Sequence, residues 1–76
     1  MSENLVEALT TEILRVTEIH GYYIETAEDE TGIQKQILLS LALDIQNTID
    51  IGRQAHGTGD ILQMIPALQD LQAIHE

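Results

Sequence analysis

The sequence contains no cysteine, one proline and only two aromatic residues, Tyr22 and Tyr23, among its 76 residues. Without cysteine there is no disulfide, no thiol nucleophile and no cysteine–metal site. The absence also suits a reducing compartment, so a cytoplasmic protein is expected. A chain of this length forms a single domain, residues 1–76, which buries only about 60% of its unfolded surface. Its core depends on ten Leu, eleven Ile and two Val, and oligomerisation is the simplest way to enlarge it.

Basic residues are scarce as well: Arg15, Lys35 and Arg53 face thirteen acids, which gives a formal net charge of −10. Direct binding to DNA, RNA or anionic lipid needs a cationic footprint, so the charge argues against it. The charge keeps an aliphatic-rich chain in solution, and it also suits a basic protein partner. The longest apolar stretch, residues 37–43, is far shorter than the roughly 20 residues of a membrane span. The N-terminus is acidic, unlike a signal peptide, so no membrane association is expected.

The first predicted helix covers residues 3–20, with Ser2 as its N-cap. At about 100° per residue, its apolar residues fall on one stripe: Leu5, Leu9, Ile13, Val16 and Ile19. The opposite, polar face carries Glu3, Glu7 and Glu18. Gly21 is expected to end or loosen this helix. Residues 22–32 are interpreted as a loop or as the acidic first turn of the next helix.

The second predicted helix covers residues 33–51, and Gly52 is a candidate stop signal. Its main apolar stripe consists of Ile37, Leu38, Leu41, Ile45 and Ile49. Leu39 and Leu43 point almost the opposite way, so the middle of this helix is apolar nearly all round. Because such a helix is either central in a bundle or shared between subunits, Leu39 and Leu43 are predicted to be oligomer contacts.

The third predicted helix covers residues 60–75 after a glycine-containing turn at residues 56–60. Pro66 disfavours a helix interior, but apolar residues on both sides of it share one face, which favours one kinked element. The predicted fold class is therefore all-α: a small bundle of three helices, in which a long antiparallel hairpin carries a shorter third helix. We expect this bundle to be completed by oligomerisation.

The first functional hypothesis is a non-enzymatic acidic adaptor or inhibitor that binds a basic protein partner, including a nucleic-acid-binding one. One form of it is a phage-type anti-defence protein that imitates nucleic acid. Its partner-binding residues are the acids of the first helix and of the segment after it: Glu3, Glu7, Glu18, Glu25, Glu28, Asp29 and Glu30.

The alternative hypothesis is an oligomer that sequesters a nucleotide-like anion, because aromatic rings stack on bases and cations pair with phosphates. The candidate residues are Tyr22, Tyr23, Lys35, Arg53 and His56. The start Gly21-Tyr22, followed by acids and a helix, loosely resembles phage anti-CBASS proteins, which sequester cyclic nucleotides. We do not assign the chain to that family.

In size, acidity and helical order the chain resembles acyl carrier proteins, which attach phosphopantetheine to a Ser between Asp and Leu. Here Leu39 precedes Ser40-Leu41, and no Asp-Ser-Leu occurs, so a carrier-like domain is the third choice. Ser40 also has no histidine near it in sequence, and no HExxH spacing is present. We therefore expect no catalysis, no bound metal and no cofactor.

Overall fold

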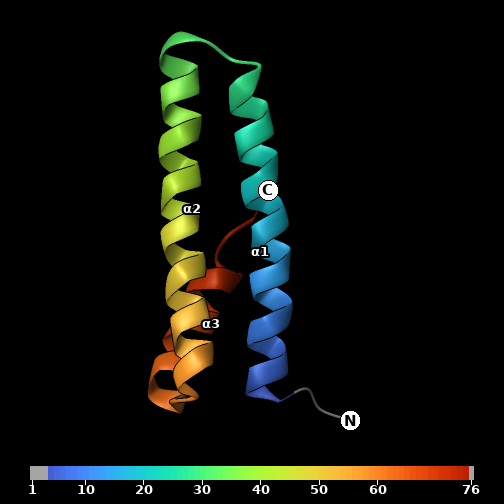
Figure 1. Ribbon diagram of the computed structural model, residues 1–76, viewed down its shortest axis with the longest axis vertical. Helices are drawn as coiled ribbons and strands as arrows, with labels where there is room; N and C mark the ends of the chain where they lie inside the picture. Colours follow the sequence, from blue (N-terminus) through green and yellow to red (C-terminus); the bar gives the residue numbers. More distant parts are fainter. Residues whose placement is uncertain (1–3, 76) are drawn as a thin grey trace.

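A computed structural model describes residues 4–75, and within that range the chain forms three α-helices and no strand. Helix α1 spans Leu5–Glu28, α2 spans Gly32–Thr58 and α3 spans Ile61–Gln72. Figure 1 shows α1 and α2 as a long antiparallel hairpin, with α3 packed beside one half of it. The all-α class, the long hairpin and the shorter third helix are thus confirmed.

Helix α1 begins and ends later than the sequence pattern indicates. Its N-cap is Asn4, whose Oδ1 accepts a hydrogen bond from the backbone N–H of Glu7 at 2.8 Å; Ser2 lies outside the described residues. The helix continues through Gly21 to Glu28, so the prediction of a loop or the first turn of the next helix over residues 22–32 was wrong for residues 22–28, and the connection is limited to residues 29–31. Tyr23 and Ala27 extend the buried stripe by two turns, and this packing outweighs the weak helix propensity of one glycine.

Helix α2 also continues past its predicted stop. Gly52 lies inside the helix and is buried, because α2 packs closely against both other helices there. The helix ends instead at Gly59, whose φ of +67° is the left-handed conformation that closes many helices. The N–H of Gly59 donates to the carbonyl of Ala55 at 3.1 Å.

Helix α3 runs as a single helix through Pro66, as predicted, although it ends at Gln72 rather than near residue 75. Asp60 caps it by accepting a hydrogen bond from the N–H of Leu62 at 2.9 Å. Pro66 has no N–H to offer the carbonyl of Leu62. Since Leu62 is 83% exposed, its carbonyl can accept a hydrogen bond from water instead.

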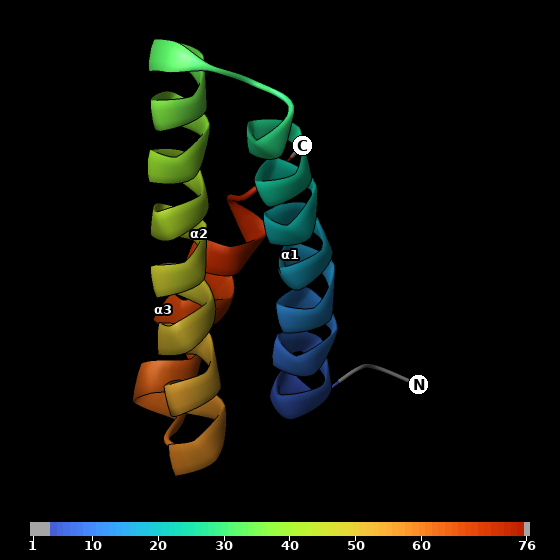
Figure 2. The same ribbon diagram turned by 45° about the horizontal axis from the view of Figure 1, so that its top comes forward.

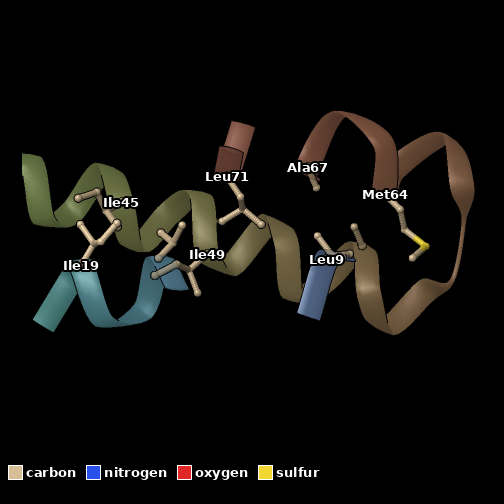
Figure 3. Close-up of a cluster of buried hydrophobic side chains, with 9 residues drawn as sticks. Leu9, Ile19, Ile45, Ile49, Met64, Ala67 and Leu71 are labelled. Atoms are coloured by element: carbon tan, nitrogen blue, oxygen red, sulfur yellow. The ribbon is translucent and has the colours of Figure 1, made fainter. Parts of the chain in front are cut away.

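The core is one aliphatic cluster shared by all three helices (Figure 3). It consists of Leu9, Val16, Ile19, Ile45, Ile49, Ala55, Met64, Ala67 and Leu71. The predicted stripe of the first helix is confirmed, because Leu9, Val16 and Ile19 are buried and Leu5 and Ile13 pack against them.

The third helix covers only part of the hairpin. At 1.5 Å per residue, α3 is about 18 Å long and α2 about 40 Å, and Figures 1 and 2 show no third helix beside the end that joins α1 to α2, called here the upper half. Ile45 and Ile49 are buried in the cluster that α3 shares, whereas Ile37 and Leu41, predicted on the same stripe, are 53% and 43% exposed. The radius of gyration, 13.8 Å, accordingly exceeds the value of about 11 Å expected for a compact chain of this size.

Candidate functional site

Three acids form a line along the outward side of α1. Glu7, Glu18 and Glu25 are exposed, and their spacings of eleven and seven residues correspond to about three and two helical turns. We call these three residues the acidic line. Glu28 and Asp29 are exposed at its C-terminal end and Glu30 is half-buried beyond them, whereas Glu3 lies outside the described residues. The structure thus brings the predicted acids of α1 onto one exposed side.

The acids at the end of α1 are placed where the helix itself disfavours them. The C-terminus of a helix carries partial negative charge, so an acid in the last turn is unfavourable by about 0.3–1 kcal/mol at an exposed site. In α1, Leu5–Glu28, no basic residue lies in the last turn, which holds Glu25 and Glu28. The chain therefore keeps like charges together at a position where helix stability alone would select Lys or Arg.

Arg15 is the one arginine or lysine of α1, and it does not neutralise the acidic line. Its guanidinium pairs with Glu12 and donates hydrogen bonds to the carbonyls of Leu71 at 3.0 Å and of Ile74 at 2.8 Å. Leu71 is in the last turn of α3 and Ile74 lies two residues beyond its end, where carbonyls lack the i+4 N–H partners of a helix interior. Arg15 thus holds the end of α3 against α1, a role that no sequence pattern indicated.

The candidate ligand residues fall at separate places on the hairpin. Arg53 and His56 line one groove of about 260 Å³, called here the lower groove, together with Thr10, Ile13 and Leu14. Lys35 lies on the same helix as Arg53 but eighteen residues away, which is about 27 Å along the axis. A site that uses both cations therefore needs more than one chain.

The two tyrosines lie on the upper half of α1. Their rings meet edge to face, with centroids 6.3 Å apart and planes at 72°. Tyr23 packs against the core, whereas the ring of Tyr22 is largely exposed. Tyr22 is thus the aromatic surface that this end of the chain offers to a ligand, and Tyr23 supports the bundle.

A second groove opens on the upper half of the hairpin. It has a volume of about 350 Å³ and is lined by Thr26 and Glu30 from the end of α1 and by Gln34, Ile37 and Leu38 from α2. We call these five residues the upper groove. The sequence placed Ile37 and Leu38 in the core, and it gave no sign of this groove, because the groove exists only where α3 stops short.

Leu39 and Leu43 are exposed on α2, directed away from Ile45 and Ile49 as their spacing predicted. Ser40 is likewise exposed, in the interior of α2, rather than at the start of a helix as in acyl carrier proteins. Within residues 4–75, no three side chains of the metal-binding types come together. In the same range, none of the helices has the length and apolar character needed to cross a membrane.

A comparison of the chain with known protein families, curated proteins and solved structures finds no match. Function is therefore inferred from the side chains of this chain alone.

Proposed function

We propose that this chain is an acidic binding protein, an adaptor or inhibitor that engages a basic surface of another protein. The observation that carries the proposal is the acidic line, together with Glu28 and Asp29, because these acids are exposed and no cation of α1 is left to neutralise them. Such a surface steers a basic partner toward α1 and raises the rate of encounter.

The spacing of the charges distinguishes two ways of binding a basic partner: electrostatic steering and imitation of nucleic acid. The acidic line holds three charges over eighteen residues, about 27 Å of helix, whereas double-stranded DNA carries about sixteen charges over that length. The acidic line is thus far sparser than a phosphate backbone. The chain attracts a basic protein by its net field, rather than presenting phosphate-like charges one by one.

The test compares two double variants that remove the same amount of charge. Glu18→Gln with Glu25→Gln neutralises two acids of the acidic line, and Asp50→Asn with Asp70→Asn neutralises two exposed acids on α2 and α3. The immobilised chain should retain basic proteins from a cell lysate at low salt and release them at about 0.5 M salt. The first double variant should lose them and the second should keep them. Retention that is indifferent to salt, or equal loss in both variants, would contradict the proposal.

A second candidate function rests on the lower groove, where Arg53 and His56 stand three residues apart on one face of α2 above the apolar Ile13 and Leu14. A cation over an apolar floor suits a nucleotide-like anion. If this groove binds such a ligand, nucleotides will raise the melting temperature of the wild-type chain but not that of Arg53→Gln. An unmoved melting temperature across linear and cyclic nucleotides would remove this candidate.

A further inference from the structure

The upper groove continues the channel that α3 occupies. Gly52 of α2 and Arg15 of α1 mark the side of the hairpin on which α3 packs, since both contact its C-terminal part. Leu41 and Thr26 lie eleven residues away from them, about three turns toward the upper half and on the same faces. A helix already fills the lower part of this channel, so the channel between α1 and α2 is suited to receive a helix.

The floor of the open part is apolar. Ile33, Ile37 and Leu41 follow one another at four-residue intervals on α2, and all three are exposed. Leu38 lies half-buried beside them and lines the groove. A row of apolar side chains at this spacing is what an amphipathic helix buries when it lies in a groove, and exposed apolar surface grouped in this way is typical of interaction sites.

Charge decides which occupant fits. The five residues that line the upper groove include one acid, Glu30, and no base. Asp44 lies exposed three residues beyond Leu41 on the same face. Lys35 precedes Ile37 by two residues and therefore points to another side of α2. A second copy of this chain would bring another formal charge of −10 to this rim, whereas a basic helix is attracted to it.

We propose that the upper groove binds an amphipathic helix of a protein partner, with an apolar stripe flanked by Lys or Arg. This inference rests on the proposed function and specifies where the basic partner docks. The apolar stripe lies on Ile33, Ile37 and Leu41, in line with α3, and the basic flanks face Glu30 and Asp44.

The probe is a dye-labelled synthetic peptide of eighteen Leu and Lys residues, with Leu at helical i, i+3, i+4 and i+7 spacing. Its affinity for the full chain is measured by fluorescence anisotropy, beside a peptide of the same composition whose leucines are scrambled. Ile37→Ser should weaken binding of the amphipathic peptide about tenfold. Ile51→Ser should change it less than twofold: this control removes the same residue type from the same helix at 55% exposure, against 53% for Ile37. Circular dichroism confirms that both variants remain folded.

The outcomes separate the two proposals. If both peptides bind equally and only Glu18→Gln with Glu25→Gln weakens them, the acidic surface binds basic partners but the groove does not, and this inference fails alone. If neither peptide binds, both proposals fail. If sedimentation shows that the chain alone is a dimer that Ile37→Ser dissociates, a second copy occupies the groove and the inference is overturned.

Discussion

Two glycines inside helices provide the sharpest test of the packing, because the same substitution has opposite effects at the two positions. Around Gly21 of α1, a Cβ atom would meet nothing within 4 Å. Gly21→Ala therefore gains helix propensity with no steric penalty, and should stabilise the fold by about 0.5–1 kcal/mol. At Gly52 of α2, a Cβ would lie 3.0 Å from Cδ1 of Leu71 and 3.5 Å from Cγ1 of Ile13.

Leu71 has little room to move away, since it is fully buried in the core drawn in Figure 3. Overpacking of this kind costs about 1–3 kcal/mol, which exceeds the propensity gained. Gly52→Ala should therefore destabilise the fold by about 1 kcal/mol, and Gly52→Val, with two more methyl groups, by about 2–4 kcal/mol.

Urea unfolding followed by circular dichroism at 222 nm measures these differences, and a change of 1 kcal/mol corresponds to a shift of about 4–8 °C in Tm for a domain of this size. If Gly52→Ala stabilised the chain as much as Gly21→Ala does, the three helices would not meet at Gly52 as described.

Four further predictions concern the ends, surfaces and upper half of the bundle. Arg15→Met should lower stability by about 1–2 kcal/mol in thermal melts, with Arg15→Lys in between, because the carbonyls of Leu71 and Ile74 lose the hydrogen bonds that join them to α1; a melt like that of the wild type would refute this role. Asp60→Ala should cost about 1 kcal/mol through loss of the α3 cap, with Asp50→Asn as an exposed control that leaves stability unchanged. If α2 mediates oligomerisation, Leu39→Glu and Leu43→Glu should yield folded monomers, since both side chains are exposed within one chain; an unaltered sedimentation profile would refute this assignment. Amide hydrogens of residues 33–41 should exchange with deuterium faster than those of residues 45–55, because only the latter stretch contains buried residues, among them Ile45 and Ile49; equal protection would show that something covers the upper half.

The sequence predicted the parts of the fold that depend on periodicity within one element. The stripe of α1 and the opposed directions of Leu39 and Ile45 follow from about 100° per residue alone, and the structure has both. Helix ends were predicted poorly because a glycine can either end a helix or lie within one. Gly21 was read as a stop, but the burial of Ala27 holds the helix together beyond it. Gly52 was read the same way, yet it marks the close approach of two other helices.

The candidate surfaces also differ in whether the sequence could predict them. Glu7, Glu18 and Glu25 share a side of α1 by spacing, so their grouping could be derived from sequence once the helix was long enough to include Glu25. The upper groove could not, since it depends on how far α3 reaches along the hairpin, and helix periodicity contains no such information. Arg15 was missed for a similar reason, because its partners lie 56 and 59 residues away.

The short third helix links the stability of this chain to its proposed binding role. A longer α3 would cover Ile37 and Leu41, which are half exposed, and at about 25 cal/mol per Å² of buried apolar surface that cover would strengthen a small core. The chain instead leaves the upper half as a two-helix hairpin, with acids at the end of α1 that weaken the helix further. Both features reduce the stability of the same region, and both favour a basic, apolar-faced partner there. A partner that supplies the missing cover and the missing cations would bind and stabilise this half of the molecule at once.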